Sequence, residues 1–134
     1  MSFIDRGRSA QTRAPLVLVA AGDERTRREV RRVAESRGYA THEVSDGVEA
    51  VEAAMRLVPA AVVLDRILPR LGAGEVAERL KENAATESVP LFALAAKAEL
   101  GDRSHLFAGY VSKPLDSVRL SEALQAISRA SRAS

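Results

Sequence analysis

The sequence predicts an α/β protein with a parallel five-stranded sheet covered by helices on both faces. The first indication is that apolar runs of strand length alternate along the chain with segments of helical periodicity. The second is that these runs are too continuously apolar for strands with one solvated face, which is typical of parallel strands buried on both sides. The 134 residues have the length of one ordinary domain.

Start and stop signals delimit the predicted elements. Asp23, Asp46 and Asp116 each precede a helical segment, and Gly38 and Pro59 close the first two. In chain order we expect strand 15–20, helix 23–37, strand 39–44, helix 46–58, strand 60–64, helix 74–83, strand 89–94, a short helix 98–106, strand 109–112 and a last helix after 116. The expected inward stripes are Thr26, Val30, Val33, Ala34 and Arg37, then Val76, Ala77 and Leu80, then Val118, Leu120, Leu124 and Ile127.

Two charged residues of opposite sign end buried strands. Asp65 follows the most apolar strand, and Lys113 follows the last one. Since function in open parallel sheets lies at the carboxyl ends of the strands, both side chains should share one edge. A carboxylate at the end of a buried strand is either paired or held there for chemistry. The flexible stem of lysine could bring its ammonium to that carboxylate. We therefore expect an ion pair between Asp65 and Lys113.

The composition excludes several classes of protein. With 46% hydrophobic and 28% charged residues the chain is globular in character, and it contains no cysteine for disulfides or thiolate metal sites. No apolar run reaches the ~20 residues that cross a bilayer. We expect a cytoplasmic protein without a membrane partner. Residues 1–14 and 131–134 are polar and rich in arginine, which predicts disordered tails around a domain at 15–130.

Arginine dominates the basic residues, accounting for seventeen of twenty. Two stripes are expected on the exposed side of the first helix, namely Arg25, Arg28 and Arg32, and Arg27 and Arg31. They could meet an acidic partner, but few aromatic residues accompany them, so nucleic acid is not an expected partner. His42 and His105 have no acidic or cysteine partner at ligand spacing and are expected at the surface.

Three motifs now carry a resemblance to a known family. They are VVLDRILP at 62–69, GYVSKP at 109–114, and Gly38-Tyr39 followed by SDGVEA at 45–50. Their order and spacing are similar to those of the receiver domain of bacterial two-component response regulators, over roughly residues 15–130. The resemblance implies a CheY-like, flavodoxin-like doubly wound sheet in three α/β/α layers, acting in a two-component or phosphorelay pathway.

The resemblance also implies roles for individual residues. Asp65 matches the aspartate that accepts a phosphoryl group from a histidine kinase, and Lys113 matches the lysine that contacts this phosphate. Tyr110 matches the aromatic switch residue. Such a domain is no enzyme, apart from helping to catalyse phosphoryl transfer to its own aspartate.

Other family positions are altered. Ala21 and Gly22 stand where the family has an acidic pair, and Ala95 stands where it has a threonine or serine that senses the phosphate. The interval from Ala95 to Lys113 is about one helical turn short, so the fourth helix should be small or unwound. These departures predict a switch without its usual hydroxyl.

The same departures weaken the expected metal site. Mg²⁺ prefers six oxygen ligands, often including one or two carboxylates. Here the ligands would be Asp65, a backbone carbonyl and either Asp23 or Glu24, so we expect no cofactor, or Mg²⁺ held weakly. A shift of two residues that makes Asp23 and Glu24 the acidic pair stays open, although it shortens the first helix.

Two hypotheses for function follow. In the first, the chain is a pseudo-receiver whose partner reads the surface of the fourth helix, fifth strand and fifth helix without phosphorylation. In the second, it is a working phosphoacceptor, modified on Asp65 by a histidine kinase with Mg²⁺. The altered positions favour the first hypothesis. The expected partners are signalling proteins, either a histidine kinase or an output partner, and a homodimer stays open.

Overall fold

The computed structural model describes residues 14–133. The predicted tail at 1–14 lies almost wholly outside these residues. The elements are β1 (Leu16–Ala20), α2 (Glu24–Ser36), β2 (Ala40–Val44), α3 (Gly47–Leu57), β3 (Ala61–Asp65), α4 (Ala73–Lys81), β4 (Leu91–Leu94), the 3₁₀ segment η1 (Lys97–Leu106), β5 (Gly109–Tyr110) and α5 (Ser117–Ala133). Residues 131–133 of the other predicted tail belong to α5, and residue 134 lies outside the described residues.

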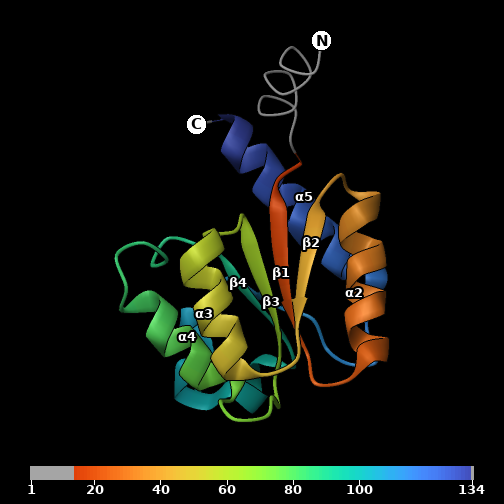
Figure 1. The fold of residues 1–134 in the computed structure, drawn as a ribbon. Helices are drawn as coiled ribbons and strands as arrows, with labels where there is room; N and C mark the ends of the chain where they lie inside the picture. Colours follow the sequence, from red (N-terminus) through yellow and green to blue (C-terminus); the bar gives the residue numbers. More distant parts are fainter. Residues whose placement is uncertain (1–13, 134) are drawn as a thin grey trace.

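The five strands form one parallel sheet in the order β2-β1-β3-β4-β5, which confirms the predicted architecture. The helices α2 and α5 cover one face, while α3 and α4 cover the other (Figure 1). Each face has its own apolar core. Strand residues alternate between the two cores: Val17 and Val19 pack with α2 and α5, and Leu18 and Ala20 pack with α3.

The helices begin where the sequence predicts. Asp23 and Asp46 cap α2 and α3 by accepting the backbone N–H groups of Thr26 and Glu49 at 2.9 and 2.8 Å. Asp116 likewise accepts the N–H of Arg119 at the start of α5. Side-chain caps of this kind satisfy N–H groups that have no partner inside the helix.

Two residues of the predicted inward stripes point outward instead. Arg37 lies just past the end of α2, where its side chain is exposed and donates to the hydroxyl of Ser121 on α5. Val118 is 68% exposed in the first turn of α5, on the side away from the buried Leu120. The remaining members of both stripes are buried or half-buried.

The short helix predicted at 98–106, the fourth in the predicted order, is the 3₁₀ segment η1 in the structure. The short interval between Ala95 and Lys113 predicts such a small or unwound helix. Its two halves meet at Gly101, whose φ of 57° lies in the left-handed region. No side chain of η1 is fully buried, in contrast to those of α4. None of the helices in the described part of the chain is long and apolar enough to span a membrane.

Candidate functional site

The predicted ion pair is present at the carboxyl edge of the sheet. The Nζ atom of Lys113 donates to Oδ2 of Asp65 at 3.0 Å, and the other carboxylate oxygen accepts the backbone N–H of Arg66 at 2.9 Å. The Asp65 side chain is 11% exposed, whereas that of Lys113 is 43% exposed. The lysine therefore reaches from the solvent to an almost buried carboxylate. Both carboxylate oxygens of Asp65 therefore have a hydrogen-bond partner.

Asp23 lies close enough to this pair to be influenced by it, but it is engaged in capping. Its Oδ2 accepts both the backbone N–H and the hydroxyl of Thr26, at 2.9 and 2.8 Å. These two hydrogen bonds, with a further contribution from the positive charge of Lys113, hold the pKa of Asp23 below its usual value. No local pattern predicts the hydroxyl bond of Thr26, a buried polar residue on the inward face of α2.

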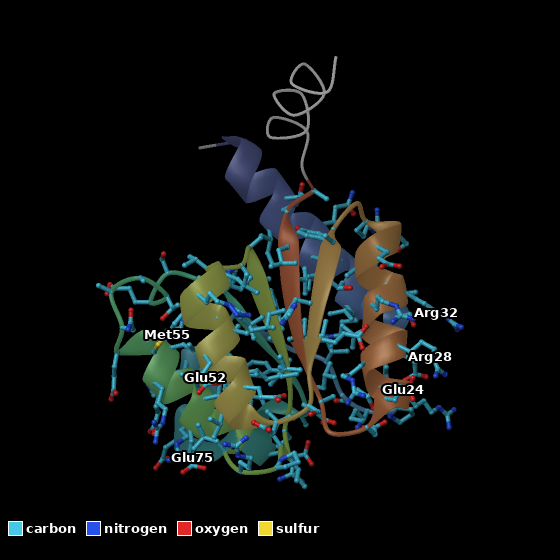
Figure 2. The ribbon with its side chains drawn as sticks, in the orientation of Figure 1. Glu24, Arg28, Arg32, Glu52, Met55 and Glu75 are labelled. Carbon is cyan, nitrogen blue, oxygen red and sulfur yellow. The ribbon has the colours of Figure 1, made fainter. Side chains whose placement is uncertain are left out.

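The side chains at this edge fit Mg²⁺ poorly. Ala21 and Gly22 follow β1 and contribute no side-chain oxygen, and Glu24 pairs with Arg28 on the outer side of α2 (Figure 2). Asp65 is bonded to Lys113, and Asp23 is bonded to Thr26. Across residues 14–133, no three histidine, aspartate or glutamate side chains gather closely enough to hold a metal ion.

Ala95 and Tyr110, the two predicted switch positions, are held by packing and hydrogen bonding. Ala95 follows β4, is buried, and carries a methyl group where a hydroxyl would be needed to bind an anion. The hydroxyl of Tyr110 donates to the backbone carbonyl of Ser104 in η1 at 2.6 Å. This bond attaches β5 to η1 without involving Asp65.

The loop that follows Asp65 is held on both sides. On one side, the carbonyl of Pro69 accepts the N–H of Gly47, and Arg70 donates to Asp46 at 3.1 Å. On the other, Nε of Arg66 lies 3.7 Å from Oε2 of Glu99 in η1. The sequence analysis did not find this second contact. Glu99 accepts the backbone N–H of Ala96 at 2.8 Å, but alanine cannot complete a capping box, so neither Glu99 nor Arg66 had a sequence signal.

Only one of the two predicted arginine stripes faces the solvent. Figure 2 shows Arg28 and Arg32 on the outer side of α2. Arg27 and Arg31 instead bind Glu43 of β2, at 3.4 and 2.8 Å, and this part of the prediction is wrong. Because Glu43 balances one of the two positive charges of Arg27 and Arg31, the exposed basic surface is smaller than the sequence suggests.

A large apolar groove lies away from the Asp65 edge, beside β5 and α5. It has a volume of about 910 Å³ and is lined by Tyr39, Phe92, Tyr110, Arg119 and Ile127, among others. Its walls are mostly aromatic and aliphatic, with the guanidinium of Arg119 at one side, where it donates to the carbonyl of Tyr110. Such a surface suits contact with another apolar group rather than phosphoryl chemistry.

The fold and this edge define a receiver-type signalling domain. A family model for the response regulator receiver domain matches residues 17–125, and the chain belongs to that family. The predicted resemblance is confirmed by this match, as is the CheY-like fold.

Relatives at the sequence level are parts of larger signalling proteins. The chain is 34% identical over 117 residues to the response regulator MprA of Mycobacterium leprae, covering 84% of this chain and 50% of that protein. It is 33% identical over 102 residues to the transcriptional regulatory protein SrrA of Staphylococcus aureus, covering 73% of this chain and 41% of that protein. The chain thus spans half or less of the length of these relatives.

Solved structures share the fold. The receiver domain of a sensor histidine kinase from Pseudomonas aeruginosa, solved with a magnesium ion in its active-site cleft, has a TM-score of 0.75 and 26% identity; the match covers 84% of this chain and 96% of that one. A CheY-like receiver domain from Methylobacillus flagellatus has a TM-score of 0.77 and 23% identity, with 85% and 98% of the two chains covered.

Proposed function

We propose that this receiver domain acts as a protein-interaction module whose signalling state does not depend on phosphorylation of Asp65. The observation that carries the proposal is the lack of side-chain oxygens at Ala21 and Gly22, in an edge where Lys113 binds Asp65 directly at 3.0 Å. Phosphoryl transfer needs positive charge to neutralise the incoming group. Here the available ammonium already neutralises the acceptor.

The altered switch positions support the same proposal. Ala95 has no hydroxyl to bind an anion on Asp65, and Tyr110 is bonded to the backbone of Ser104. The second half of η1 is therefore held to β5, on the surface that a partner would contact, by a bond that does not include Asp65. We propose a histidine kinase or an output protein of a two-component pathway as partner, with the groove beside α5 as part of the contact. The cytoplasmic location expected from the sequence stays a prediction.

A second candidate function is that of a working phosphoacceptor. It is favoured by the position of Asp65 at the end of β3, with Lys113 within hydrogen-bond distance, in a chain that belongs to the receiver family. In this case Mg²⁺ would be held weakly, with Asp23 as the remaining nearby carboxylate. The only chemistry of the domain would be its own phosphorylation and dephosphorylation.

Intact-mass spectrometry after incubation with acetyl phosphate and Mg²⁺ tests the proposal. We expect no gain of a phosphoryl mass in the folded wild-type chain. A gain that disappears in Asp65→Asn would contradict the proposal and establish the second candidate. The matched control is Ala21→Asp/Gly22→Asp, which restores two carboxylates after β1 and is expected to bind Mg²⁺ more tightly than the wild type in a titration followed by NMR.

A further inference from the structure

Arg66 connects the acceptor strand to η1. It directly follows Asp65, to which its backbone N–H donates, and its guanidinium lies beside Glu99 with an Nε to Oε2 distance of 3.7 Å. The register of the sheet explains the proximity, since Asp65 at the end of β3 pairs with Leu94 at the end of β4. The residue after β3 and the first turn of η1 therefore lie at the same edge.

Glu99 uses both carboxylate oxygens in this connection. Oε2 faces Arg66, and Oε1 accepts the backbone N–H of Ala96 at 2.8 Å. The side chains of Arg66 and Glu99 are 42% and 50% exposed. An ion pair with this exposure contributes little to stability and is easily exchanged for a better partner. We call the hydrogen bond from the Ala96 N–H to Oε1 of Glu99 the cap on Ala96. A change in the charge facing Arg66 should therefore alter this cap.

Asp65 is the nearby group whose charge balance can change. Its carboxylate is almost buried, so an unneutralised negative charge there attracts cations more strongly than a surface charge does. Lys113 now provides the neutralisation. Arg66 is the next residue along the chain, its backbone N–H already binds Asp65, and its side chain carries a positive charge that can respond if Lys113 is removed or an anionic group is added to Asp65.

We propose that Arg66 is a positioning residue that couples the charge at Asp65 to the first half of η1 through Glu99. Additional negative charge at Asp65 draws the guanidinium away from Glu99, and the cap on Ala96 weakens.

The second half of η1 should not respond. Arg103 donates to both carboxylate oxygens of Glu78 on α4, at 3.0 and 3.3 Å, and Tyr110 holds the carbonyl of Ser104. Gly101 separates this half from the first. The inference deepens the proposed function, because it concerns regulation at the same edge, but its test needs no phosphoryl donor and can fail independently of it.

The test is amide exchange with water, measured by NMR on the full chain. Lys113→Met leaves Asp65 without its cation, and we expect the amide of Ala96 to exchange about twofold to fivefold faster, the range that corresponds to an exposed ion pair. The same substitution in an Arg66→Gln background should produce no further change. Residues after Gly101 should exchange as in the wild type. Lys97→Met is the matched control, with rates corrected for the intrinsic effect of the substitution, and should leave Ala96 unchanged.

A second variant distinguishes the expected effect of Lys113→Met from misfolding of that variant. Asp65→Asn/Lys113→Met removes both charges together, and we expect the Ala96 amide to exchange at the wild-type rate. The inference is overturned if Lys113→Met leaves Ala96 unchanged, if its effect persists with Arg66→Gln, or if Asp65→Asn/Lys113→Met exchanges as fast as Lys113→Met alone.

Discussion

Val58 adopts a backbone conformation that valine disfavours. It ends α3 with a φ of 42°, in the left-handed region, and its side chain is 48% exposed. A β-branched residue in this conformation stores strain on the order of 1 kcal/mol or more. We predict that Val58→Gly raises the free energy of unfolding by about 1 kcal/mol, less than the full strain because glycine gains freedom in the unfolded chain. Urea denaturation followed by circular dichroism measures the change.

Val118→Gly is the control for this prediction, and we expect it to lower the free energy of unfolding. Val118 is more exposed than Val58, but it lies within α5. Glycine in a helix lowers stability by roughly 0.5 kcal/mol relative to valine. Equal changes of the same sign in the two variants would show that loss of the valine side chain, and not relief of strain at Val58, governs the result.

Individual site residues differ in how far the sequence could predict them. The contact between Asp65 and Lys113 was predictable because Asp65 ends β3 and Lys113 closely follows β5, and the carboxyl ends of parallel strands meet at one edge. The contact between Arg66 and Glu99 was not, since it joins a loop to a segment whose backbone path depends on Gly101. Side-chain contacts between irregular segments have no periodicity to indicate them.

At the level of elements, Gly47 determines how the loop after Asp65 packs on α3. A Cβ atom at this position would overlap the carbonyl oxygen of Leu71, and the Gly47 N–H donates to Pro69 in the same loop at 3.0 Å. The backbone of the loop cannot move away without losing this bond. We predict that Gly47→Ala lowers the free energy of unfolding by about 1–3 kcal/mol, the usual cost of overpacking, measured by urea denaturation.

Gly22→Ala is the control for this prediction. Gly22 faces the same loop, but its added Cβ would lie 3.4 Å from Cδ of Pro69, which is an ordinary contact. Gly22→Ala should leave the free energy of unfolding nearly unchanged. A loss similar to that of Gly47→Ala would mean that the loop tolerates no added group at all, and the specific overlap with Leu71 would not be the cause.

Most elements were predictable because their signals are local. Buried apolar runs, aspartate caps and helical periodicity place nine of them within a few residues of their observed bounds. The exception is η1, whose type of helix differs from the prediction. The sequence predicts a short helix at 98–106, whereas the structure has 3₁₀ turns that are interrupted at Gly101. Its side chains form no buried stripe, so periodicity could not distinguish the two.

For the whole molecule, alternation of strands and helices predicts a parallel sheet but not the order of its strands. That order, β2-β1-β3-β4-β5, involves contacts between segments that are far apart in the sequence. The hydroxyl of Tyr39 at the start of β2, for example, donates to the carbonyl of Leu124 in α5 at 2.7 Å. A buried bond across 85 positions of the chain has no local signal.

The stability of the whole domain should fall in acid because two helices on opposite faces of the sheet depend on ionised caps. The pKa of Asp23 is lowered by the backbone N–H and hydroxyl of Thr26, and that of Asp46 by the backbone N–H of Glu49 and by Arg70. A carboxyl whose pKa is lowered on folding stabilises the folded state above its unfolded value of 3.8 and loses this contribution as the pH falls through its folded value. We predict that the free energy of unfolding declines steadily below about pH 4.

The double variant Asp23→Asn/Asp46→Asn isolates this effect. Asparagine still accepts the N–H groups that open α2 and α3, but it has no proton to gain in acid. Unfolding by urea at a series of pH values should therefore give a smaller acid slope for the variant than for the wild type, while both unfold in one transition. Equal slopes would assign the acid sensitivity to other carboxylates, with the exposed pair of Arg103 and Glu78 as the next to examine. Because α2 and α3 lie on opposite faces, a reduced slope in each single variant would also show that the two cores unfold together.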